Sequence, residues 1–237
     1  SILLTNVGLV SHLIAAIGFG VLAGTVLWRR NQTGTSLWLV IAAMMTMVWA
    51  ATVVMAVRHG GLYLALLSPM ETLRTASWIV FVVALLRVSW RLDERLSSSF
   101  IVASAIGFIT ALQLVLDFAV LLGMVPPSAL PLVGVIFLVS RMTVAISGLV
   151  LIHNLYVNAE PQSRNSIRLL CIGLAGFFGY DLNLYTLSFL MGRMSPDLFN
   201  IRGAVDAIVI PLLLLSSSRT WVARVRSEER RVGKECL

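Results

Sequence analysis

Long apolar runs constrain the fold of this sequence more than any other feature. An α-helix needs about 20 apolar residues to cross the hydrocarbon layer of a membrane. The 237 residues are 58% hydrophobic and only 12% charged, which lies outside the usual composition of soluble domains. Apolar runs joined by short, turn-rich connections occupy residues 7–28, 36–57, 62–86, 100–123, 130–156, 167–191 and 203–217. We therefore predict an all-α bundle of seven transmembrane helices that fills residues 1–225.

The distribution of arginine predicts how these spans are oriented. Short connections that are rich in arginine stay on the cytoplasmic side of a membrane. One side carries Arg29, Arg30, Arg87, Arg91, Arg95, Arg164, Arg168, Arg219 and Arg224, and the other carries only Arg58, Arg193 and Arg202. We expect the N-terminus to lie outside and the C-terminus in the cytoplasm. The net charge of +7 then reflects membrane topology, and we expect no nucleic-acid partner.

Several ionisable side chains interrupt the predicted spans. A charge near the middle of a span costs about 2.5–3.5 kcal/mol, so such side chains usually face the bundle interior. The candidates are His12, Glu71, Arg74, Asp117, Arg141, Asp181 and Asp206. With the predicted orientation, all of them lie in the outer half of the membrane. Asp181, Tyr185 and Ser188 share one helix face, because they stand at positions i, i+4 and i+7.

Two interpretations of these residues stay open, and they are compatible with each other. Interhelical ion pairs, such as Glu71 with Arg74 and Asp181 with Arg141, would fix the register of the helices. Alternatively, an outward-facing polar cavity would bind a ligand or an ion. The candidate site comprises Asp181, Tyr185, Arg141, Glu71, Arg74, Asp117 and Asp206. Arg202 and Asp206, four residues apart at the mouth of the last span, can also pair locally.

The sequence carries no signature of a common enzyme class. It contains no GxSxG, HExxH or Walker motif. Its two cysteines, Cys171 and Cys236, form no metal-ligand pattern. The single lysine, Lys234, lies outside the predicted spans, which excludes a retinal Schiff base within them. We expect no metal, no cofactor and no catalytic residue in this chain.

A family resemblance is carried by residues 180–219, which contain YDLNLYTLSFL and then RMSPDLFNIRGAVDAIVIPLLLLSSSR. Together with the earlier LIHNLYVNAEPQSRNSIRLLCIGLAG, they resemble the N-terminal membrane region of the PEP-CTERM system histidine kinase PrsK family. The resemblance implies a bacterial inner-membrane protein that works as a homodimer. It also implies phosphotransfer to a response regulator that controls exopolysaccharide and PEP-CTERM export genes. No phosphoacceptor-histidine helix or Gly-rich ATP-binding box is present here, so this chain would sense or anchor and could not autophosphorylate.

These observations predict a membrane sensor region of a truncated two-component kinase, in contact with the lipid bilayer. We expect that an outer-side event near Asp181, Arg141 and Glu71 shifts the last three spans and moves the helix end at Ser216 to Arg219. The alternative is a small-solute transporter or a standalone membrane subunit, for which polar residues should continue toward the inner side.

The last residues differ in composition from the rest. The string RSEERRVGKEC, Arg226 to Cys236, contains the only lysine of the chain. It resembles the translation of a sequencing-adaptor read-through. We therefore expect residues 226–237 to be an artefactual tail.

Overall fold

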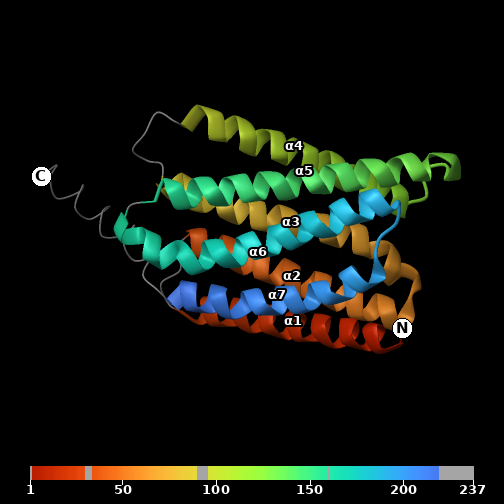
Figure 1. Ribbon diagram of the computed structural model, residues 1–237, viewed down its shortest axis with the longest axis horizontal. Helices are drawn as coiled ribbons and strands as arrows, with labels where there is room; N and C mark the ends of the chain where they lie inside the picture. Colours follow the sequence, from red (N-terminus) through yellow and green to blue (C-terminus); the bar gives the residue numbers. More distant parts are fainter. Residues whose placement is uncertain (1, 30–33, 90–95, 160, 219–237) are drawn as a thin grey trace, which may run out of the picture.

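The computed structural model describes residues 2–29, 34–89, 96–159 and 161–218, and in these ranges the fold consists of helices joined by short turns, without strands (Figure 1). The elements are α1 Ile2–Trp28, α2 Gly34–His59, α3 Gly61–Ser89, α4 Leu96–Leu121, η1 Pro127–Ala129, α5 Leu130–Val157, α6 Pro161–Met191 and α7 Pro196–Ser218. All seven α-helices are long and apolar enough to cross a membrane, which confirms the predicted fold class. The tail expected at residues 226–237, and Arg219 and Arg224, lie outside the described residues.

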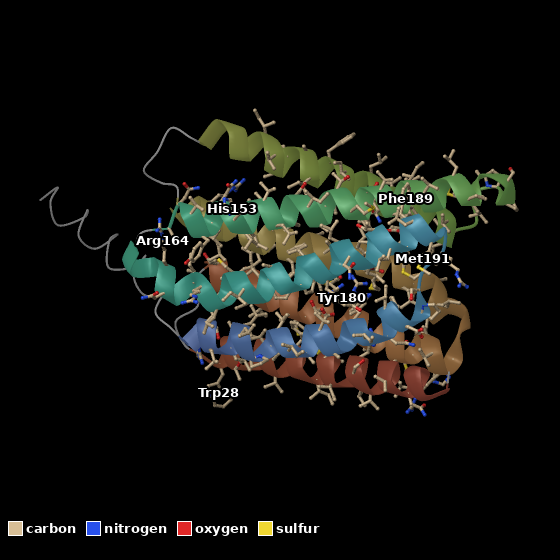
Figure 2. All side chains as sticks on the ribbon, in the orientation of Figure 1. Trp28, His153, Arg164, Tyr180, Phe189 and Met191 are labelled. Carbon is tan, nitrogen blue, oxygen red and sulfur yellow. The ribbon has the colours of Figure 1, made fainter. Side chains whose placement is uncertain are left out.

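The helices pack antiparallel in chain order, and α1 also packs against α7, so that distant parts of the sequence lie side by side (Figure 1). Helix α4 contacts α3 and α5 and lies at the edge of the bundle (Figure 1). The start of α1 and the connections α2–α3, α4–α5 and α6–α7 share one end, which we call the turn end. Helix α7 finishes at the opposite end, which we call the exit end. Figure 2 labels Phe189 and Met191 near the turn end and Trp28, His153 and Arg164 near the exit end.

A layer of aromatic side chains crosses the middle of the bundle. The ring of Trp78 lies 6.1 Å from that of Phe19, 5.9 Å from that of Phe81 and 5.6 Å from that of Phe177, between centroids. Trp78 Nε1 donates a hydrogen bond of 2.9 Å to Thr46 Oγ1, so the polar atom of this buried ring is satisfied. The layer therefore links α1, α2, α3 and α6 through both packing and a hydrogen bond.

Helix α7 begins earlier than predicted, at Pro196 instead of residue 203. Ser195 Oγ accepts a hydrogen bond of 3.4 Å from Leu198 N. Pro196 and Asp197 then occupy the first turn. A backbone N–H in this turn has no acceptor within the helix, so proline loses no hydrogen bond there, and the negative charge of Asp197 interacts favourably with the helix dipole. Arg202 is consequently inside the helix and fully buried, and the expectation that it lies in a connection is wrong.

Candidate functional site

The structure brings the predicted site residues into one buried cluster, which we call the charge network. Its members are Glu71, Arg74, Asp117, Arg141, Asp181, Tyr185, Arg202 and Asp206. Arg141 is 12% exposed on its side chain, and the others are at most 5% exposed. At a rise of 1.5 Å per residue, Asp117 lies about 6 Å and Arg74 about 20 Å from the helix ends at the turn end. The network therefore occupies one half of the bundle.

Arg202 of α7 lies at the centre of the network. Its Nε and Nη2 approach Asp181 Oδ1 at 2.9 Å and 2.7 Å, and its Nη1 approaches Glu71 Oε1 at 2.5 Å. Nη2 also donates to Tyr185 Oη at 3.0 Å, and the Tyr185 hydroxyl donates in turn to Glu71 Oε1. Charge-assisted bonds of this kind are roughly twice as strong as neutral ones. Arg202 thus joins α7 to both α3 and α6.

Arg74 of α3 forms a second link to α7. Its Nη2 lies 3.1 Å from both carboxylate oxygens of Asp206, and its Nη1 lies 3.6 Å from Asp181 Oδ2. The guanidinium carbon sits 4.2 Å from the ring centroid of Trp49 and 4.1 Å from that of Phe177. A desolvated cation–π contact stabilises by about 2 kcal/mol. The two rings hold the charge of Arg74 in a fixed place above the aromatic layer.

Arg141 and Asp117 form the part of the network toward α4. Arg141 Nη1 lies 3.5 Å from Glu71 Oε2, and Nη2 donates to Ser68 Oγ at 2.7 Å. The Ser68 hydroxyl donates to Asp117 Oδ1 at 2.6 Å, and Thr72 Oγ1 donates to Asp117 Oδ2 at 2.5 Å. Ser68 and Thr72 were not among the residues predicted from the sequence. Their spacing of four residues, on the face that continues to Thr75, is the signal that could have identified them.

The pairings differ from those expected. Arg141 pairs with Glu71, and Asp181 pairs with Arg202 and Arg74. The bonds of Arg202 and Asp206 go to residues on other helices, where local pairing was expected. Both residues are buried within α7, so their side chains reach across the bundle to opposite charges instead of meeting along the helix surface.

His12 packs between α1 and α7 beside the network. Its Nδ1 lies 2.7 Å from Gly8 O, and its ring stacks on Phe199 with centroids 5.7 Å apart. A Cβ atom placed on Gly203 would lie 2.7 Å from His12 N. Glycine at position 203 therefore allows α1 and α7 to approach closely beside the network.

A small cavity of about 20 Å³ opens between α3, α4, α5 and α6. It is lined by Glu71, Thr72, Thr75, Thr110, Gln113, Arg141, Val144, Ala145, Asp181 and Tyr185. This volume holds about one water-sized particle. Among the described residues, no group of three or more His, Cys, Asp or Glu side chains is placed to hold a metal ion. The cavity can therefore accept a water molecule or one small ion and excludes larger solutes.

The buried charged side chains of the described residues lie in the half of the bundle at the turn end. Among the described residues, the buried Asp, Glu, Arg and His side chains all belong to the network or lie beside it, as His12 does. The core beyond the aromatic layer is mainly apolar, with residues such as Leu22, Val82, Leu86, Leu174 and Leu213, and its buried polar side chains include Ser36 and Ser216. No protein-family model, curated protein or solved structure matches this chain.

Proposed function

We propose that this bundle is the membrane-embedded sensor and anchor region of a two-component histidine kinase. The observation that carries the proposal is the attachment of α7 to the charge network. Arg202 and Asp206 on α7 bind Glu71 and Arg74 on α3, and the same helix continues to Ser218 at the exit end. A change in the network therefore acts on the helix that leads out of the bundle.

The free energy of one ion pair in the network is large enough to shift α7 between two conformations. Breaking a buried ion pair by removing one partner costs about 3–5 kcal/mol. Two conformations of a signalling protein typically differ by a few kcal/mol, so a change of this size reverses their populations. Pro211, five residues beyond Asp206, lacks the backbone donor that a helix interior normally uses. We propose that α7 responds to the network by bending or sliding at this position.

The confinement of charge to one half of the bundle favours a sensor over a transporter. A transporter needs polar groups that continue across the membrane. Here the aromatic layer around Trp78, and beyond it a mainly apolar core without buried charge among the described residues, separate the network from the exit end. The inner-membrane location, the homodimer and the response-regulator partner belong to this proposal and are supported by the family resemblance of residues 180–219.

The proposal is tested with the complete protein, including whatever its gene encodes after Ser218, in lipid nanodiscs. Autophosphorylation from ATP is compared for wild type, Asp206→Asn and Asp181→Asn. Thr52→Val is the matched control, because Thr52 Oγ1 bonds only its own helix at Val48 O, on the exposed side of α2. We expect each Asp variant to change the rate at least threefold and the control to match wild type. Folded Asp variants with the wild-type rate, or a gene that encodes no kinase core, would refute the proposal.

A further inference from the structure

We propose that the cavity binds one small monovalent cation of the size of Na⁺. The cavity lies between Glu71, Asp181 and the threonines of α3 and α4. The inference names the ligand of the site described above, and its biological meaning rests on the proposed sensor role. Cation binding is nevertheless measurable without any signalling output.

The charge balance of the network calls for one additional positive charge. The network contains four carboxylates and three guanidinium groups. The carboxylates are those of Glu71, Asp117, Asp181 and Asp206, and the guanidinium groups are those of Arg74, Arg141 and Arg202. In their ionised forms these groups leave one formal negative charge inside the bundle. An uncompensated charge in the hydrocarbon region is costly. One bound monovalent cation or one proton on a carboxyl group neutralises the network, and a sodium titration at constant pH distinguishes the two.

The wall of the cavity is mostly apolar, but carboxylate and hydroxyl side chains among its lining residues carry oxygen lone pairs. Thr75 Oγ1 donates its only proton to Glu71 O at 3.0 Å, and Thr72 Oγ1 donates its proton to Asp117 Oδ2 at 2.5 Å. Each hydroxyl can then offer only its remaining lone pairs to a ligand. Asp181 Oδ2 is buried and accepts no hydrogen bond, its ion pair with Arg74 Nη1 is long at 3.6 Å, and its residue lines the cavity. Carboxylate and hydroxyl oxygens are the ligands that hard cations prefer.

The size and charge of the cavity select a monovalent ion. A volume of about 20 Å³ admits one particle of the size of water and excludes organic cations. Arg141, which also lines the cavity, repels a divalent ion more strongly than a monovalent one. Gln113 Nε2 lacks a hydrogen-bond partner. Rotation of the terminal amide by about 180° exchanges its nitrogen and oxygen, which places the Gln113 side-chain oxygen at the position of Nε2. The geometry therefore fits Na⁺ better than Zn²⁺ or Ca²⁺.

The test measures the thermal unfolding of the purified full chain in nanodiscs by tryptophan fluorescence. NaCl is titrated against N-methyl-D-glucamine chloride at constant pH and ionic strength. We expect a saturable rise in Tm, of about 3 °C at a sodium concentration ten times the dissociation constant. Thr75→Val should weaken the apparent affinity about tenfold, which corresponds to about 1.4 kcal/mol. The control Thr52→Val loses the same type of bond to its own helix, 2.8 Å long, and should keep the wild-type affinity.

Two results would overturn the inference. The first is a wild-type Tm that does not depend on sodium, and the second is a sodium shift that is the same in wild type and Thr75→Val. If Thr75→Val does not fold, Gln113→Leu replaces it with the same expectation, and ²³Na NMR of the wild type reports binding directly. A wild type without sodium binding, whose Asp206→Asn variant still changes autophosphorylation, would reject the cation and retain the sensor proposal.

Discussion

Replacement of Arg202 by glutamine gives the sharpest test of how the bundle is held together. The fully buried arginine contacts Asp181 at 2.7 Å, Glu71 at 2.5 Å and Tyr185 at 3.0 Å. Glutamine removes the positive charge and leaves two buried carboxylates without their shortest ion pairs. Removing one partner of a buried pair costs about 3–5 kcal/mol. We expect Arg202→Gln to lower the free energy of unfolding by about 4 kcal/mol, the middle of that range.

The assay is equilibrium unfolding in mixed micelles, combined with a double-mutant cycle. Asp181→Asn in the Arg202→Gln background removes one of the stranded carboxylates, so the double variant should lose about 2 kcal/mol less than the sum of the single losses. Arg141→Gln is the internal comparison. Its ion pair with Glu71 is longer, at 3.5 Å, and partly exposed. We expect it to cost about 1 kcal/mol. A loss below about 1 kcal/mol for Arg202→Gln, or additivity within about 0.5 kcal/mol, would refute the network as a coupled unit.

Three further substitutions probe separate features. Arg74→Lys loses the planar group held between Trp49 and Phe177, and should cost about 2 kcal/mol in the same unfolding assay, whereas wild-type stability would exclude a role for stacking. Gly203→Ala places a Cβ 2.7 Å from His12 N and should cost about 1–3 kcal/mol. The control Gly24→Ala has no atom within 4 Å of the added Cβ and should be neutral or stabilise by about 1 kcal/mol. Equal changes in stability for Gly203→Ala and Gly24→Ala would contradict the close α1–α7 contact. Asp117→Leu removes the acceptor of Ser68 and Thr72, so amide exchange in α4 should rise about tenfold with α1 unchanged, and a uniform rise would argue against local docking of α4.

Apolar length predicts the number of helices well, but it places some of their ends poorly. The predicted span 130–156 agrees with α5, which is Leu130–Val157. Helices α6 and α7 start six and seven residues before the predicted spans, at Pro161 and Pro196. Hydropathy detects the part of a helix that is apolar, and polar helical turns at its ends escape it. The Ser195–Pro196–Asp197 start signal was available in the sequence and would have moved Arg202 into the bundle.

The candidate residues were predictable, but their partners were not. A charge in an apolar span almost always faces the bundle interior, and Glu71, Arg74, Asp181 and Asp206 are recognisable from the sequence for this reason. Their pairing depends on which helices are neighbours, and Arg74 meets Asp206 across 132 residues of sequence. Apolar runs carry no information about the contact between α1 and α7 or about the edge position of α4. The ion pairs predicted from the sequence differ from the observed ones because the sequence does not show which helices are neighbours.

Control of the exit end of α7 by the charge network is tested most directly by a distance measurement. Cys171 and Cys236 are first replaced by alanine. Spin labels are then attached at Val150 of α5, which is 45% exposed, and at Leu215 of α7, which is 54% exposed. Double electron–electron resonance compares this background with the same protein carrying Asp206→Asn. We predict that the mean distance between the labels changes by about 1–2 Å or more in the variant. Identical distance distributions in two folded proteins would contradict the coupling of α7 to the network.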